Sequence, residues 1–248
     1  MSLSLPWESS LRGATDSPGS LTVVIPAHNE EESIRLAVSE ALGIYPHNSA
    51  LVTVIVVDDA STDKTVAVVE QMAIGESRVQ LLALPVNVGA NRAIFAGVAA
   101  ANTEFVGFVP ADRQVRASEL RRCLEVIGDA DIVWTVRLVR ADPWFRRALS
   151  VSYNWLVRVL FGLPVHDVDS VFVGRRGPIQ RLLPLLVSRS DFLPVEFLVR
   201  ADRRGLKLRE VAVVHYPRQS GQASAVAPRF VMMTFMDLVR GAWALRRS

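Results

Sequence analysis

Two hydrophobic patterns alternate along the first 110 residues: short β-branched runs, and stretches with apolar residues three and four positions apart. The short runs predict buried strands at residues 21–26, 51–57, 79–84 and 104–109. The longer stretches predict helices at residues 30–42 and 90–101, and a third helix capped by Thr62 or Asp63. Strands that alternate with helices are typical of a parallel, doubly wound α/β sheet.

The second half of the chain is less regular, but the same patterns apply. We expect strands at residues 131–136, 171–173 and 208–214. We expect helices at residues 117–127, 142–161, 178–187 and 194–204, and a last amphipathic helix from about Pro228 to Arg246. No repeat or linker separates two units, so we expect a single domain.

Composition narrows the class of protein. The chain has 248 residues, 50% of them hydrophobic and 21% charged, which suits a folded α/β domain and excludes disordered and collagen-like classes. A single cysteine, Cys123, excludes a disulfide scaffold and a Cys-rich zinc module. No apolar run approaches the ~18–20 residues that cross a bilayer, and no secretory signal is visible. We therefore expect a cytoplasmic protein, and leave open peripheral attachment to the inner face of the membrane and homo-oligomerisation.

The basic residues of this chain are almost all arginine, since Lys64 and Lys207 are the only lysines. Arginine matches phosphate oxygens with a rigid fork, which favours a phosphate-bearing partner, although a GC-rich genome would give the same bias. The arginines are dispersed and no aromatic-basic recognition motif accompanies them, so we expect no nucleic-acid partner.

Polar clusters follow three of the predicted strands: His28-Asn29-Glu30, Asp58-Asp59 and Asp112-Arg113-Gln114. In a parallel sheet the carboxyl ends of the strands share one edge, where ligands bind. Helix capping would explain a single acid there. Crowded carboxylates repel one another unless a cation or ligand donors balance them, so three clusters favour a nucleoside diphosphate with a divalent cation.

Taken in order, these segments resemble family 2 inverting glycosyltransferases with the GT-A fold. Those similar to the nucleotide-sugar half are 23–32 (VVIPAHNEEE), 56–63 (VVDDASTD), 87–97 (NVGANRAIFAG) and 108–114 (FVPADRQ). Those similar to the acceptor half are 167–172 (DVDSVF), 192–205 (FLPVEFLVRADRRG) and 210–221 (EVAVVHYPRQSG). The branch of dolichol- and polyprenyl-phosphate sugar synthases is the most similar.

The resemblance implies a Rossmann-like, mostly parallel sheet with helices on both faces. It covers a GT-A domain at 21–225, with halves at about 21–115 and 116–225. The residue pattern outside it predicts a flexible lead-in at 1–20 and a C-terminal amphipathic helix at 226–248. The resemblance implies nucleotide-sugar contacts from Pro26, Ala27, His28, Glu30, Asp58, Asp59, Arg92, Ala111, Asp112 and Gln114. A nucleobase offers N–H donors to a carboxylate, which suits Asp59.

The family's metal motif is Asp-x-Asp followed two residues later by Gln, and here it begins with Pro110 in place of the first acid. The resemblance implies Mg²⁺ or Mn²⁺ bound by Asp112, Gln114 and His215. Because diphosphate oxygens can supply most ligands of Mg²⁺, one carboxylate suffices, with weak metal affinity before the nucleotide binds. Ligation by His215 would favour Mn²⁺, whereas the alternative is a hydrogen-bonded structural histidine.

On the acceptor side the resemblance implies three catalytic candidates, Asp169, Glu196 and Arg218. Asp169 or Glu196 would act as general base toward a hydroxyl acceptor, and Asp167 is an equal candidate by sequence alone. A polyprenyl phosphate is already ionised, so Asp169 would then orient it. Arg218 would neutralise the leaving diphosphate or grip an acceptor phosphate.

The expected function is transfer of a sugar from a UDP- or GDP-sugar to an acceptor, with a polyprenyl (lipid) phosphate as the favoured acceptor. Two alternatives stay open. The acceptor could be a hydroxyl of a soluble small molecule, or Pro110 could mark a catalytically degenerate nucleotide-sugar-binding protein. The helix at 142–161 mixes aromatic residues with arginines, which suits a bilayer interface but equally a protein core.

Overall fold

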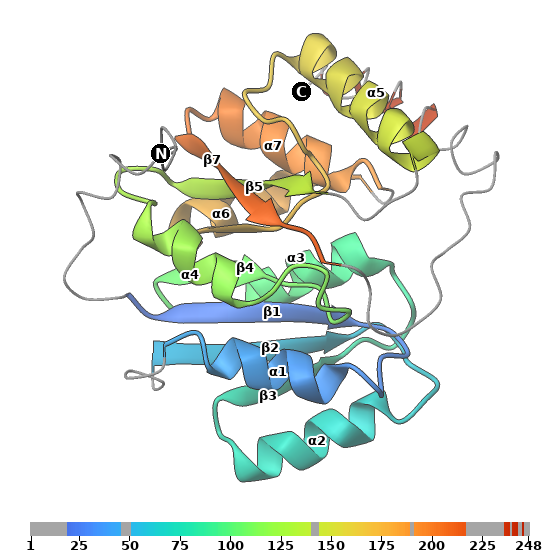
Figure 1. Ribbon diagram of the computed structural model, residues 1–248, viewed down its shortest axis with the longest axis vertical. Coiled ribbons are helices and arrows are strands. Elements are labelled where there is room, and N and C mark those ends of the chain that lie inside the picture. Colours follow the sequence, from blue (N-terminus) through green and yellow to red (C-terminus); the bar gives the residue numbers. More distant parts are fainter. Residues whose placement is uncertain are drawn as a thin grey trace, which may run out of the picture.

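The computed structural model describes residues 19–45, 51–139, 144–188, 191–216, 236–238, 240–242 and 245. The described residues form a seven-stranded sheet in the order β3-β2-β1-β4-β6-β5-β7 (Figure 1). The strands are β1 (Leu21–Ala27), β2 (Val52–Asp58), β3 (Val79–Ala83), β4 (Phe105–Phe108), β5 (Ile132–Val139), β6 (Phe172–Arg175) and β7 (Leu208–Val214). The helices are α1 (Ile34–Leu42), α2 (Thr65–Gly75), α3 (Ala90–Ala100), α4 (Ser118–Glu125), α5 (Trp144–Phe161), α6 (Arg176–Leu182), the 3₁₀ turn η3 (Leu183–Leu185) and α7 (Leu193–Arg203).

The sheet is mostly parallel, as predicted. β1 pairs in parallel with β2 and β4, β2 with β3, and β5 with β7, whereas β6 runs antiparallel to β4 and β5. The carboxyl ends of β1, β2, β4, β5 and β7 therefore share one edge with the start of β6. We call this edge the carboxyl edge, and the candidate nucleotide-binding residues described below lie at strand ends, in loops or at the start of a helix beside it.

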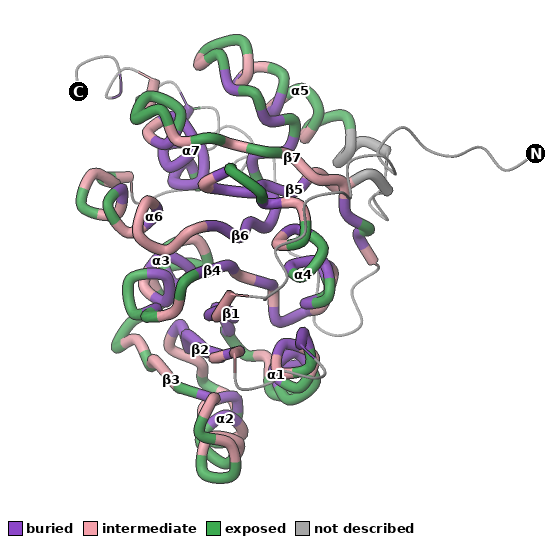
Figure 2. The backbone as a smooth tube through the Cα atoms, turned by 90° about the vertical axis from the view of Figure 1, so that its left-hand side faces the viewer, coloured by how far each residue is buried: buried purple, intermediate pink, exposed green. Residues whose placement is uncertain are grey.

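Helices cover both faces of the sheet, because successive side chains of a buried strand point to opposite sides. On β1, Val23 and Ile25 belong to the core with α1, whereas Val24 belongs to the core with α3. Figure 2 shows α1 and α4 on one side of the strands and α3, α6 and α7 on the other. A Cβ on Gly97 of α3 would lie 2.4 Å from Val24 Cγ1, so glycine is what lets α3 pack closely on the sheet.

Most element boundaries agree with the prediction, with a difference after β6. The helix expected at 178–187 is α6 followed by η3, because Pro184 lacks the N–H that an α-helix would need at that point. The lead-in up to residue 18 and most of the expected last helix lie outside the described residues. Within the described part of the chain, no helix has both the length and the apolar character for crossing a membrane.

Candidate active site

Three non-glycine residues with positive φ mark the turns after β1, β2 and β4: Asn29 (57°), Ala60 (57°) and Arg113 (61°). Such backbone angles are uncommon outside glycine, and their clustering marks a functional edge. The first two turns are joined directly. Asn29 N donates to Ser61 Oγ at 2.9 Å, and Thr62 N donates to Asn29 Oδ1 at 2.8 Å.

The adjacent acids Asp58 and Asp59 are both buried, at 2% and 3% exposure, but they have different partners. Asp59 accepts from the backbone N–H groups of Val88 at 2.7 Å and Gly89 at 2.9 Å, which fixes the start of α3 to the end of β2. Asp58 Oδ2 accepts from Ser61 N at 3.1 Å, whereas Asp58 Oδ1 has no hydrogen-bond partner among the described residues. Buried polar atoms are rarely left in this state, so Asp58 Oδ1 is suited to a donor from a bound ligand.

The other predicted nucleotide-binding residues of the first half lie around these acids. His28 is exposed, with Nδ1 2.8 Å from the Asp59 carbonyl oxygen. Glu30 is half-buried and accepts from Ser33 Oγ at 2.5 Å. Arg92 is exposed in the first turn of α3. Together with Pro26 and Ala27 at the end of β1, they lie on adjacent segments at the carboxyl edge.

The loop after β4 lies beside the end of β7, although about 100 residues separate them. Asp112 is 8% exposed and accepts from Gln114 N at 3.0 Å through Oδ1. Tyr216 N donates to the Gln114 carbonyl oxygen at 2.8 Å, and the Arg116 guanidinium lies 4.3 Å from the centre of the Tyr216 ring. These contacts bring the buried His215 next to the loop that carries Asp112. Ala111, at 3% exposure, completes it.

The donors here suit a divalent cation that shares its coordination with a ligand. A carboxylate, a carboxamide and an imidazole are available from Asp112, Gln114 and His215, and Mn²⁺ accepts both oxygen and nitrogen ligands. Across the described ranges, no three His, Cys, Asp or Glu side chains are grouped to hold a metal ion by themselves. Diphosphate oxygens would therefore have to supply much of the coordination shell.

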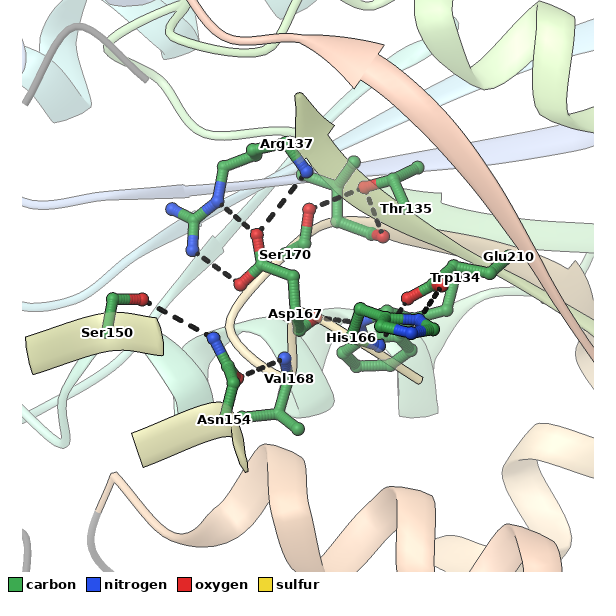
Figure 3. Close-up of polar contacts among 11 residues, drawn as sticks. Trp134, Thr135, Arg137, Ser150, Asn154, His166, Asp167, Val168, Ser170 and Glu210 are labelled. Atoms are coloured by element: carbon green, nitrogen blue, oxygen red, sulfur yellow. Dashed lines mark hydrogen bonds and ion pairs between the residues drawn. The ribbon is translucent and has the colours of Figure 1, made fainter. Parts of the chain in front are cut away.

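The acceptor-side segment 166–170 leads into β6 at the same edge, and Figure 3 shows its contacts. Asp167 is 1% exposed and is held by Arg137, with Nε 2.6 Å from Oδ2 and Nη2 2.8 Å from Oδ1. Asp167 is therefore committed to an internal ion pair. Asp169, by contrast, is exposed. Burial, together with the charge of Asp169, raises the pKa of Tyr153 above its ordinary value, which indicates that Asp169 lies near α5.

Glu196 lies in the first turn of α7 and is 1% exposed. Its carboxylate accepts from the N–H groups of Val187 at 3.1 Å and Ser188 at 2.8 Å, and from Arg200 Nε at 2.8 Å. Through these contacts Glu196 fixes the loop before α7. A general base needs a carboxylate within reach of the acceptor, and the carboxylate of Glu196 is instead buried and hydrogen-bonded.

Several residues that the sequence did not single out contact the 166–170 segment. Among them are Arg137 near the end of β5 and Asn154 on α5, whose Oδ1 accepts from Val168 N at 3.0 Å. One feature of the sequence could have indicated Asn154: it is a polar residue on the side of the predicted helix that carries Val157 and Phe161. Arg218, the remaining catalytic candidate, lies outside the described residues.

Most of this chain is similar in sequence to known proteins. Residues 22–182 match the family model described as Glycosyl transferase family 2. An uncharacterized glycosyltransferase of Mycobacterium tuberculosis (strain ATCC 25618 / H37Rv) is 34% identical over 208 residues, covering 82% of this chain and 88% of that protein. The undecaprenyl-phosphate 4-deoxy-4-formamido-L-arabinose transferase of Sodalis glossinidius is 29% identical over 221 residues, covering 88% of this chain and 66% of that protein.

Solved structures share the fold. A glucosyl-3-phosphoglycerate synthase from Mycobacterium tuberculosis, in complex with Mn²⁺, UDP and glucosyl-3-phosphoglycerate, superposes with a TM-score of 0.67 at 18% identity, covering 98% of this chain and 86% of the other. A mannosyltransferase from Pyrobaculum calidifontis, in complex with GDP-Man and Mn²⁺, gives a TM-score of 0.60 at 16% identity, covering 98% and 76%. The GT-A fold expected from the sequence is thus confirmed.

Proposed function

The chain belongs to glycosyl transferase family 2, and from this premise we propose that it transfers a sugar from a nucleoside-diphosphate sugar to a polyprenyl phosphate, with inversion at the anomeric carbon. The observation that carries the proposal is the meeting of three sets of residues at one edge of the sheet. Asp58 and Asp59 lie at the end of β2, Asp112 lies beside His215, and the exposed Asp169 lies before β6.

On the donor side, the turns after β1 and β2 would hold the nucleoside. Asp58 Oδ1, which lacks a partner among the described residues, supports a contact with a ligand hydroxyl or N–H group. Asp112, Gln114 and His215 would hold Mg²⁺ or Mn²⁺, which when bound neutralises charge on the diphosphate. The two solved structures described above hold UDP or GDP-Man together with Mn²⁺, which supports this donor class.

On the acceptor side, an oxygen of the lipid phosphate attacks the anomeric carbon. A bond forms between that carbon and the phosphate oxygen, the bond to the diphosphate oxygen breaks, and the electron pair leaves with the nucleoside diphosphate. A phosphate monoester loses its second proton near a pKa of about 6, so little base catalysis is needed at neutral pH. Asp169 would therefore orient the acceptor, and the geometry of Glu196 supports a structural role for that residue.

Helix α5 supports a lipid acceptor because it presents an apolar stripe to the outside. Val151 is 66% exposed, and Trp155 and Val159 are each 62% exposed, at a spacing of four residues. A tryptophan among aliphatic residues suits the boundary between headgroups and acyl chains. The same helix contacts the 166–170 segment through Asn154, so a bilayer at this stripe would lie close to Asp169. Relatives named for undecaprenyl phosphate support the same acceptor class.

The proposal can be tested with the purified full chain, a panel of UDP- and GDP-sugars, and Mn²⁺. We expect sugar transfer to polyprenyl phosphate in anionic vesicles with at least one donor, and co-sedimentation of the protein with those vesicles. Transfer only to soluble hydroxyl acceptors would contradict the lipid acceptor and identify a small molecule as the acceptor. Nucleotide binding without transfer to any acceptor would identify a degenerate binding protein.

Asp169→Asn is expected to distinguish the two acceptor classes. The amide keeps the size of the side chain but cannot take a proton, so transfer to a hydroxyl should fall by about 100-fold or more. Transfer to a lipid phosphate should fall by less than about tenfold, because the acceptor oxygen is already ionised. The measurement is kcat with each acceptor, and equal losses with both would contradict the assignment.

A further inference from the structure

The 166–170 segment is anchored by residues from several elements. Glu210 of β7 accepts from His166 N at 2.6 Å and lies 2.7 Å from its Nδ1. Trp134 Nε1 of β5 donates to the Asp167 carbonyl oxygen at 2.7 Å. The Ser170 hydroxyl lies 2.6 Å from Thr135 Oγ1 (Figure 3). The segment is thus a rigid support rather than a loose loop.

Asn154 holds the residue that immediately precedes Asp169. Its side chain is 6% exposed, its Oδ1 accepts from the buried N–H of Val168 at 3.0 Å, and its Nδ2 lies 3.4 Å from Ser150 Oγ. Val168 immediately precedes Asp169 and is 1% exposed, whereas Asp169 itself is exposed. The backbone therefore passes from a buried, hydrogen-bonded residue to an exposed one at this point.

We propose that Asn154 is a positioning residue, which holds the Val168 amide and thereby sets the direction in which the Asp169 carboxylate faces the acceptor. The inference rests on the proposed function, because it takes Asp169 as the acceptor-side carboxylate. A buried N–H without an acceptor is unfavourable, so removing Asn154 Oδ1 would drive the Val168 peptide to turn toward another partner. Because the side chain of the next residue turns with it, Asp169 would leave its productive position.

The anchors differ in what they can control. Arg137 and Trp134 hold Asp167, two residues before Asp169, and Thr135 holds the side chain of Ser170. The hydrogen bond from Val168 N to Asn154 Oδ1 holds the backbone immediately before Asp169, whereas the Ser170 contact holds a side chain after it. Small errors in the placement of a reacting group can cost about 100-fold in rate, so this one bond is sufficient to matter.

The test compares Asn154→Leu with Val157→Ala, which removes apolar volume from the same helix and leaves Asn154 in place. In Asn154→Leu we expect amide hydrogen exchange in residues 166–170 to become about tenfold faster. We expect kcat with the lipid phosphate to fall by about three- to tenfold, no more than in Asp169→Asn, while the KM for the donor stays within about twofold. Val157→Ala should lower thermal stability without either of the other changes.

Unchanged exchange in Asn154→Leu, or faster exchange with an unchanged kcat, would overturn the positioning role. Equal effects of Val157→Ala on exchange and kcat would also overturn it, because they would reduce Asn154 to general packing. If Asn154→Leu does not fold, Asn154→Ala carries the same expectations without adding side-chain volume. Absence of transfer by the wild-type chain would refute the proposed function instead, and the exchange measurement would then decide by itself whether Asn154 holds the segment.

Discussion

Replacing Asp112 with alanine is expected to lower metal-dependent sugar transfer by about 100- to 1,000-fold, because a divalent cation contributes several kcal/mol of charge stabilisation to the transition state. The resemblance aligns Pro110 with the first acid of the family's metal motif and Asp112 with the second, so we take Asp112 as the carboxylate that would hold the cation. Since the described residues offer no cluster of three metal-ligating side chains, loss of this carboxylate has little internal compensation.

The measurement is kcat/KM for the donor across a Mn²⁺ titration, with a thermal-shift assay of the nucleoside diphosphate in parallel. A ligand that binds the native state raises its melting temperature, so Asp112→Ala should lose the part of the shift that depends on Mn²⁺. Asp129→Ala is a matched control, because Asp129 precedes β5 at the opposite edge of the sheet and pairs with Lys207. Near-normal turnover of Asp112→Ala would remove this residue from the site.

The parts of the fold that could be predicted from sequence are those where local pattern and burial agree. β7 was predicted at residues 208–214 and is observed there, and the first four strands differ from prediction by one residue at one or both ends. Continuous β-branched runs between polar turns mark strands that are buried on both faces. Pairing of β6 between β4 and β5 was not predictable, because strand order depends on contacts between distant segments.

The same distinction separates the two halves of the candidate site. His28, Asp59 and Asp112 follow parallel strands, so topology alone brings them to one edge. No such rule predicts the positions of the acceptor-side acids. Whether Asp167 or Asp169 faces outward depends on Arg137, which lies 30 residues from Asp167 and holds it inside. Short-range periodicity carries no information about that pair.

Glu196 shows why a motif position alone is insufficient to assign a catalytic role. The resemblance made it a candidate base, and its sequence also places Arg200 one helical turn later, a spacing at which acid and base pair on a helix. Its carboxylate also accepts hydrogen bonds from the N–H groups of Val187 and Ser188, across a turn that the sequence does not specify. It is 1% exposed on a helix whose residues 193–199 are all buried, so its charge is balanced inside the protein by Arg200 and these N–H groups.

Replacing Glu196 with alanine is therefore expected to destabilise the fold, with a free energy of unfolding lower by about 3–5 kcal/mol, because it leaves the Arg200 guanidinium and two amide groups without their shared partner in a buried place. Urea denaturation measures this loss. Glu125→Ala is the matched control, since Glu125 pairs with Arg121 at 3.0 Å across one turn of α4 but with 44% of its side chain exposed. Exposed pairs of this kind contribute less than about 1 kcal/mol.

Glu196→Gln separates the structural role from a role in proton transfer. The amide keeps an oxygen that can accept from the loop N–H groups but loses the charge that Arg200 contacts, so we expect an intermediate loss of stability. Turnover of the folded fraction should stay within about tenfold of the wild type, because a buried and fully engaged carboxylate does not reach the acceptor. If Glu196→Gln were as stable as the wild type and had no turnover, Glu196 would belong to the chemistry, and Asp169 would no longer be the leading acceptor-side residue.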